Sequence, residues 1–116
     1  MPFWLRCNLF VSSYSVGLME RNVIQETVAS DEQIVERVKR GETYLFEIIM
    51  RRYNQRLFRV IRGILNDENE AEEVMQEAYV RAYEHLDQFA GRSKFSTWLT
   101  KIAVYEAYAR SKRRQR

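Results

Sequence analysis

Three aromatic rings, two cations and several small hydroxyl residues alternate near the C-terminal end of the chain. The segment runs Phe89-Ala90-Gly91-Arg92-Ser93-Lys94-Phe95-Ser96-Thr97-Trp98. This mixture suits single-stranded nucleic acid, because bases stack on aromatic rings while cations follow the phosphates. The alternative is that Phe95 and Trp98 anchor a hydrophobic core, and we expect this of at least one of them.

A second set of residues falls along one side of the helix expected after this segment. Its members are separated by three or four positions and are Thr97, Lys101, Tyr105, Tyr108 and Lys112. A polar and aromatic stripe that continues the surface of the loop is not easily explained as core. Loop and stripe together are therefore a candidate nucleic-acid surface.

An acidic ridge is expected on the helix that precedes the loop. It consists of Glu73, Gln76, Glu77 and Val80, which lie about one turn apart and so share one face. Acids and an amide around an apolar spot suit docking on a basic coiled coil. Because acids also favour the first turn of any helix, a solvated and well-capped face is the alternative.

The chain contains few residues of the types that carry out catalysis or bind metals. One histidine, His85, and one cysteine, Cys7, leave no zinc site of usual spacing and no intramolecular disulfide. No phosphate-binding glycine loop, nucleophile elbow or His-Glu-x-x-His motif appears. We therefore expect no enzyme activity, no cofactor and no metal, with His85 structural and Cys7 incidental.

Ionisable residues are segregated along the chain, although its 116 residues carry a net charge of only +3. Residues 67–88 hold eight acidic groups and one basic group, a net charge of −7, whereas residues 89–116 hold eight basic groups and one acidic group, a net charge of +7. The two blocks predict two surfaces for two partners of opposite charge, with nucleic acid as the candidate for the basic one. Two solvated helix faces are the alternative.

The segments that must position these residues all look helical. Glycine and proline total only five residues, which argues against a turn-rich β fold, and the length fits one core. Apolar spacing predicts helices over 31–40 and 43–65, a third capped by Asp67 or Asn69 and reaching Leu86, and a fourth capped by Ser96. We expect an all-α, single four-helix domain over residues 30–116, with a loop at 87–96 and a basic tail at 110–116.

Residues 1–29 form a predicted N-terminal extension outside the core, and the first 18 of them differ in composition from the rest of the chain. Their longest uncharged run, 7–19, contains Asn8, three serines and Gly17, and it falls short of a membrane span. No secretory signal is evident, so we expect a cytoplasmic protein. Met19 opens a more ordinary sequence, which favours a translated extension or a mis-assigned start upstream. Alternatively, apolar residues of this segment cover a groove: Phe3, Trp4, Leu9 and Phe10.

Three ordered motifs resemble one bacterial family. They are Glu73-Val74-Met75-Gln76-Glu77-Ala78-Tyr79, Leu86-Asp87-Gln88-Phe89 and Phe95-Ser96-Thr97-Trp98-Leu99-Thr100-Lys101-Ile102-Ala103. Together they resemble region 2 of sigma factors of the extracytoplasmic-function (ECF) group, over about residues 31–114. The resemblance implies a helical module whose acidic helix binds a coiled coil in the largest subunit of core RNA polymerase. It also implies recognition and melting of the promoter minus-ten element, through capture of a base flipped from the non-template strand.

Carried onto this chain, the resemblance assigns the acidic ridge to polymerase and the loop and stripe to single-stranded DNA. The polymerase contacts would be Glu73, Gln76, Glu77 and Val80. The DNA contacts would be Phe89, Arg92, Lys94, Ser96, Thr97, Lys101, Tyr105, Tyr108 and Lys112.

Some positions depart from the family pattern. Family members often carry asparagine at the position of Tyr105 and leucine at the positions of Glu106 and Ser111. A glutamate in a core position costs desolvation energy, so the end of the fourth helix is expected to fray or to face solvent. The family also continues into a second DNA-binding domain, whereas this chain stops at Arg116. The alternative function is a truncated sigma-like interaction module that binds polymerase or an anti-sigma factor without reading DNA.

Overall fold

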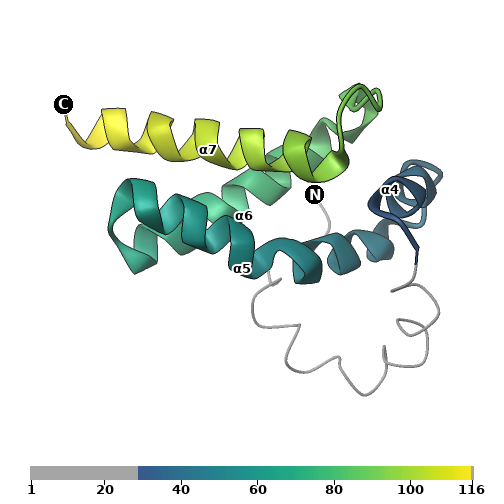
Figure 1. Cartoon of the computed structure of the whole chain (residues 1–116), viewed down its shortest axis with the longest axis horizontal. Helices are drawn as coiled ribbons and strands as arrows, with labels where there is room; N and C mark the ends of the chain where they lie inside the picture. The colour runs from purple at the N-terminus through teal and green to yellow at the C-terminus, as the bar shows by residue number, and fades with distance from the viewer. Residues whose placement is uncertain (1–28, 116) are drawn as a thin grey trace, which may run out of the picture. The chain divides into compact units, whose positions relative to one another are not determined.

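The computed structural model describes residues 29–115, so all of the predicted N-terminal extension except Ala29 lies outside the described residues. Among them the regular structure is four α-helices and two short 3-10 helices, without a strand (Figure 1). The all-α prediction is confirmed. The chain divides between Arg52 and Tyr53 into two compact units. The apolar pattern does not mark this division, because one helix runs through it.

The first unit contains α4 (Asp31–Lys39), η1 (Thr43–Leu45) and the start of α5 (Phe46–Leu65). At the start of α4 the Ser30 hydroxyl accepts a hydrogen bond from the Gln33 N–H, and the Gln33 side chain accepts one from the Ser30 N–H. This reciprocal pair is a capping box and satisfies two donors that a helix end leaves open. Gly41 follows the helix at a φ of +113°, a conformation that favours glycine.

Charged side chains hold the first unit together at its surface. Arg52 donates to the Asp31 carboxylate and to the Ala29 carbonyl, each at 2.7 Å. Arg37 donates to both carboxylate oxygens of Glu42, and this hydrogen bonding holds the pKa of Glu42 below its ordinary value. The Arg37 pair therefore stabilises the unit above the ordinary glutamate pKa, and this contribution is lost as the pH falls through the lowered one.

The second unit contains the rest of α5, then α6 (Glu68–Glu84), η2 (Leu86–Gln88) and α7 (Phe95–Arg114). Asn66, at a φ of 57°, turns the chain after α5, and the Asp67 carboxylate caps α6 by accepting from the Glu70 N–H at 3.0 Å. Helices α6 and α7 lie side by side (Figure 1). The side chains of α6 that are buried are Ala71, Val74, Met75, Ala78, Tyr79 and Ala82. Burial raises the pKa of the Tyr79 hydroxyl.

The start of the last helix differs from the prediction. Helix α7 begins at Phe95 with Lys94 as its N-cap residue, so Ser96 lies inside the first turn and does not cap it. The backbone carbonyl of Ser96 instead accepts a hydrogen bond from the Thr100 hydroxyl at 2.7 Å. The ring of Phe95 is fully buried, so the first residue of α7 is also a core residue. Of the residues expected on the buried side, Leu99 and Ala103 are fully buried, while Trp98 and Ile102 are half-buried.

The predicted basic tail is also different in the structure. Residues 110–114 continue α7 as helix, and the predicted fraying at Glu106 and beyond does not occur. The predicted third helix ends earlier than expected, at Glu84, and Leu86 is buried in the following 3-10 turn. The irregular loop is therefore confined to residues 89–94.

Candidate nucleic-acid and protein-docking surfaces

The predicted stripe on α7 is exposed along its whole length. All five of its residues are exposed, and they are Thr97, Lys101, Tyr105, Tyr108 and Lys112. The tyrosines stand out, with 68% of Tyr105 and 56% of Tyr108 accessible to solvent. At a rise of 1.5 Å per residue, the stripe is about 22 Å long. It offers two rings, two ammonium groups and a hydroxyl on one side of one helix.

The loop before α7 is closed at its base by aromatic packing. Phe89 meets Phe95 edge to face with ring centroids 5.3 Å apart, and Trp98 lies 5.5 Å from Phe89 and 5.6 Å from Phe95. Only 7% of Phe89 is exposed, so its ring belongs to this packed cluster. The prediction of Phe89 as a loop residue that contacts DNA therefore does not match its position, because a buried ring has no free face for a base. The alternative, that Phe95 is a core anchor, is confirmed.

The tip of the loop carries exposed cations. Gly91 adopts a φ of +74°, and the residues after it, Arg92, Ser93 and Lys94, are all exposed. Ser96 is half-buried and Thr97 is exposed at the start of α7. The cations at the tip thus lie a few residues from the first members of the α7 stripe.

The acidic ridge lies on the face of α6 away from its buried residues. The side chain of Glu73 is 64% exposed and that of Glu77 is 48% exposed, whereas Gln76 and Val80 are half-buried. Two carboxylates one turn apart thus share this face with a partly covered amide and a partly covered valine. The sequence pattern predicted this grouping, and the structure brings all four residues to one face.

Two arginines of α7 reach the acidic helix. Arg110 lies 3.1 Å from the Glu73 carboxylate and 3.0 Å from that of Glu77, and hydrogen bonding to Glu73 raises the pKa of the guanidinium. Arg114 donates to the Leu65 carbonyl at 2.8 Å and lies 2.9 Å from the Glu70 carboxylate. We name this set of contacts the interhelical clasp.

The clasp corrects the interpretation of the two charge blocks as two independent surfaces. Part of each block neutralises the other within the second unit. The arginines of the clasp were missed as structural residues because the basic run looked like a tail. Their spacing of four residues, matched to acids spaced three and four apart, was the available signal.

Glu106 is buried, against the expectation that the end of the last helix faces solvent. Only 5% of the residue is exposed, and its carboxylate forms an ion pair with the guanidinium of Arg81 on α6. The arginine explains how a glutamate occupies a core position, because a buried charge is tolerated when it is paired. As Glu106 is the only acid in α7, the exposed stripe of this helix carries no negative charge.

Comparison with known proteins decides the family. The family model described as Sigma-70 region 2 matches residues 49–116. The chain belongs to this family. Several of its relatives are named ECF RNA polymerase sigma factors. The RNA polymerase sigma-H factor of Pseudomonas aeruginosa is 40% identical over 81 residues, which cover 70% of this chain and 42% of the relative. The ECF RNA polymerase sigma-E factor of Escherichia coli K12 is 36% identical over 78 residues, which cover 67% of this chain and 40% of the relative.

A solved structure agrees in fold with this region 2. It is an engineered region 2 of sigmaE in complex with GTAAAA, determined by NMR, with a TM-score of 0.66 and 34% sequence identity. The match covers 74% of this chain and 92% of the other. The chain thus spans about two fifths of the length of the curated relatives above and most of the solved region 2.

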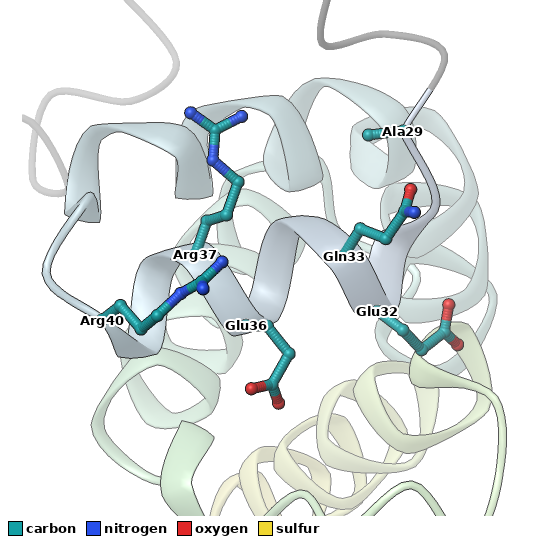
Figure 2. A pocket seen from close by; sticks show the side chains of 6 residues that line it. All are labelled: Ala29, Glu32, Gln33, Glu36, Arg37 and Arg40. Carbon is teal, nitrogen blue, oxygen red and sulfur yellow. The ribbon is translucent and has the colours of Figure 1, made fainter.

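Elsewhere in region 2, the described residues offer little for ligand chemistry. Figure 2 shows a shallow pocket lined by residues of α4 and of its two ends, where two acids are balanced in charge by two arginines. Among residues 29–115 no group of three potential metal ligands is found. His85 is exposed and lies 3.3 Å from the Gln88 amide. Within the same residues, no helix has the length and apolar character needed to cross a membrane.

Proposed function

We propose that this region 2 binds core RNA polymerase through the acidic ridge of α6. We further propose that it captures the non-template strand of the promoter minus-ten element with α7 and the tip of the loop. In this proposal the protein performs no chemistry. It ties polymerase to the promoter and stabilises the opened strand by trapping a base.

The observation that carries the DNA assignment is the exposed stripe of α7. Its rings and cations lie on one side, and the helix's single acid is buried against Arg81. Single-stranded nucleic acid is held by such a combination, because every base can stack on a ring while cations balance the phosphates. A flipped base costs a few kcal/mol, which one stacking contact of about 1–3 kcal/mol together with phosphate contacts can offset.

The relatives support both halves of the proposal. The solved sigmaE region 2, 34% identical to this chain, was determined in complex with GTAAAA. The curated relatives are named RNA polymerase sigma factors, which supports polymerase as the partner of the ridge. The aromatic cluster of Phe89, Phe95 and Trp98 then has a positioning role, because it fixes both ends of the loop that carries Arg92 and Lys94.

Strand capture is tested by fluorescence anisotropy of the full chain with a labelled DNA strand GTAAAA and with a scrambled strand of the same composition. Tyr105→Ala is expected to weaken binding of GTAAAA by about 1–3 kcal/mol if its ring stacks on a base. Thr97→Ala is expected to reduce the preference for GTAAAA over the scrambled strand. Lys94→Ala is expected to weaken both strands alike and to flatten the salt dependence.

The matched control is Tyr44→Ala. Tyr44 is 50% exposed and lies in the 3-10 turn η1, outside the α7 stripe. The Tyr44→Ala substitution therefore removes an exposed tyrosine outside the proposed DNA surface, and the affinity for both strands should not change. Equal affinity for both strands, unaltered by Tyr105→Ala and Thr97→Ala, would exclude strand reading. If the chain showed no strand preference but still bound core RNA polymerase in a pull-down, the interaction-module alternative would be favoured.

A further inference from the structure

The second half of α5 carries an exposed polar face that the proposed function leaves unused. This face consists of Gln55, Arg56, Arg59, Arg62 and Gly63, all exposed except the half-buried Arg62. At 3.6 residues per turn these positions share one side of the helix, opposite the fully buried Leu57 and Ile61. We name it the α5 arginine face.

The α5 arginine face is cationic without any acid to balance it. No aspartate or glutamate occurs between residues 53 and 66. In the part of the chain that the structure describes, no carboxylate lies within ion-pair distance of Arg56, Arg59 or Arg62. This contrasts with Arg110 and Arg114 of the same unit, which the clasp neutralises. Three positive charges thus lie within about 9 Å along the helix axis.

One arginine of this face is held in place by an aromatic ring. The guanidinium carbon of Arg56 lies 5.4 Å from the centroid of the Tyr53 ring, one turn earlier in α5. A cation over a ring at this distance is attracted by its quadrupole. The interaction limits the positions open to the guanidinium without neutralising its charge. Arg56 therefore stays available to an anion.

Gly63 adds a second observation on the same face. Glycine inside a helix costs stability relative to alanine, so its presence needs a reason. Internal packing does not supply one here, because a Cβ added at Gly63 would meet no atom within 4 Å. Gly63 lies one turn beyond Arg59 on the exposed side, and without a side chain there an outside molecule can approach the helix backbone closely between the arginines.

We propose that the α5 arginine face binds the phosphate backbone of duplex DNA. Guanidinium groups bind phosphate oxygens in pairs, and protein–DNA interfaces are polar and positively charged. The exposed positions of this face include no large apolar residue of the kind that anchors protein partners. They also include no exposed ring for base stacking, unlike the stripe of α7, which argues against a single strand. Duplex DNA fits best, because its charge density is high and no base needs to be reached.

The test compares two charge-matched double variants of the full chain by anisotropy with a labelled DNA duplex over a range of salt concentrations. Arg56→Gln/Arg59→Gln removes two charges from the α5 arginine face. Lys39→Gln/Arg40→Gln removes two exposed charges from α4, around its C-terminal end. The first variant is expected to lower duplex affinity several-fold and to reduce the slope of log affinity against log salt by about 2. The second is expected to change both much less.

Gly63→Gln tests the close approach with the arginines intact. Glutamine is the better helix former, so the melting temperature should rise by about 2–5 °C, while duplex affinity should fall because the side chain fills the gap. A melting temperature at or above that of the unchanged chain shows that lost binding is not lost folding. Unchanged duplex affinity in this variant would overturn the close approach of the DNA backbone.

Other outcomes of the charge-matched pair also decide the proposal. Equal losses in the two double variants would show an effect of net charge alone and overturn it. A larger loss for single-stranded GTAAAA than for the duplex would overturn the assignment to duplex DNA. Normal duplex binding with lost binding of core RNA polymerase would make the face a protein surface, and the proposal would be wrong. Because these variants leave α7 unchanged, failure here is distinguishable from failure of strand capture.

Discussion

At the scale of single residues, Glu106 shows how a charged side chain is kept inside a helical core. Its carboxylate is buried, while the side chain of its partner Arg81 is 55% exposed. The pair is therefore asymmetric, because most of the desolvation falls on the acid. Removing the arginine should therefore lower the free energy of unfolding more than replacing the glutamate by an apolar residue.

We predict that Arg81→Ala lowers the free energy of unfolding by about 1–3 kcal/mol, because it leaves a buried carboxylate without its cation. Glu106→Leu should be neutral or stabilising by up to about 2 kcal/mol, since an apolar side chain needs no partner there. Urea unfolding followed by circular dichroism measures both. In a Glu106→Leu background Arg81→Ala should cost little, and an equal cost in both backgrounds would contradict the pairing.

At the scale of elements, the interhelical clasp explains why the last helix stays regular to Arg114. Arg110 bridges acids of two successive turns of α6, and Arg114 donates to the carbonyl of Leu65 at the end of α5. The side chain of Arg110 is only 18% exposed, so its stem is packed as well as its charge paired. Three helices of the second unit are thus connected through the end of α7.

Loss of the clasp should be visible in stability and in its dependence on salt. Arg110→Gln is expected to lower the free energy of unfolding by about 0.5–2 kcal/mol at low ionic strength, and by less at high salt, because exposed carboxylates are screened. Urea unfolding at two salt concentrations measures this. Arg113→Gln, an exposed neighbour on the same helix, is the control. Equal effects of the two substitutions would contradict a specific clasp.

At the scale of the whole molecule, a short chain carries two surfaces of opposite charge on neighbouring helices. The ridge of α6 is acidic and the stripe of α7 is basic and aromatic, although the clasp joins the same two helices. In the proposed function, the ridge contacts polymerase while the stripe contacts a DNA strand. The contribution of the ridge to polymerase binding can be measured in the full chain.

Gln76→Ala/Glu77→Ala is expected to weaken binding of core RNA polymerase by about 2 kcal/mol, roughly 30-fold, if these residues are hot spots. Because Glu77 also pairs with Arg110, we expect a loss of stability of up to about 1 kcal/mol, more than for a purely solvated face. Titration of immobilised polymerase with the full chain measures the affinity. Glu36→Ala, an exposed acid of α4, should bind normally. Unchanged polymerase affinity in the ridge variant would argue against the ridge as the docking surface.

Local chemistry determined much of this protein from its sequence alone. The capping box of Ser30 and Gln33, the cap at Asp67 and the shared face of the α7 stripe all depend on residues within a few positions of one another. Helical periodicity fixes such relations before any packing occurs. The family resemblance was likewise evident from short ordered motifs, and the family match confirms it.

Contacts between distant residues were decided only by the tertiary structure. Arg110 meets acids 37 and 33 positions away, and Phe89 packs on the first turn of a helix that begins beyond the loop. Neither contact follows from periodicity, because each depends on how two helices pack and in which register. Glu106 is buried beside Arg81 by the packing of α7 on α6. Helix α7 also begins at Phe95, before the Ser96 that the sequence predicted as its cap. Sequence spacing shows which face a residue shares, whereas tertiary packing decides what that face meets, because burial and charge pairing depend on neighbours from other helices.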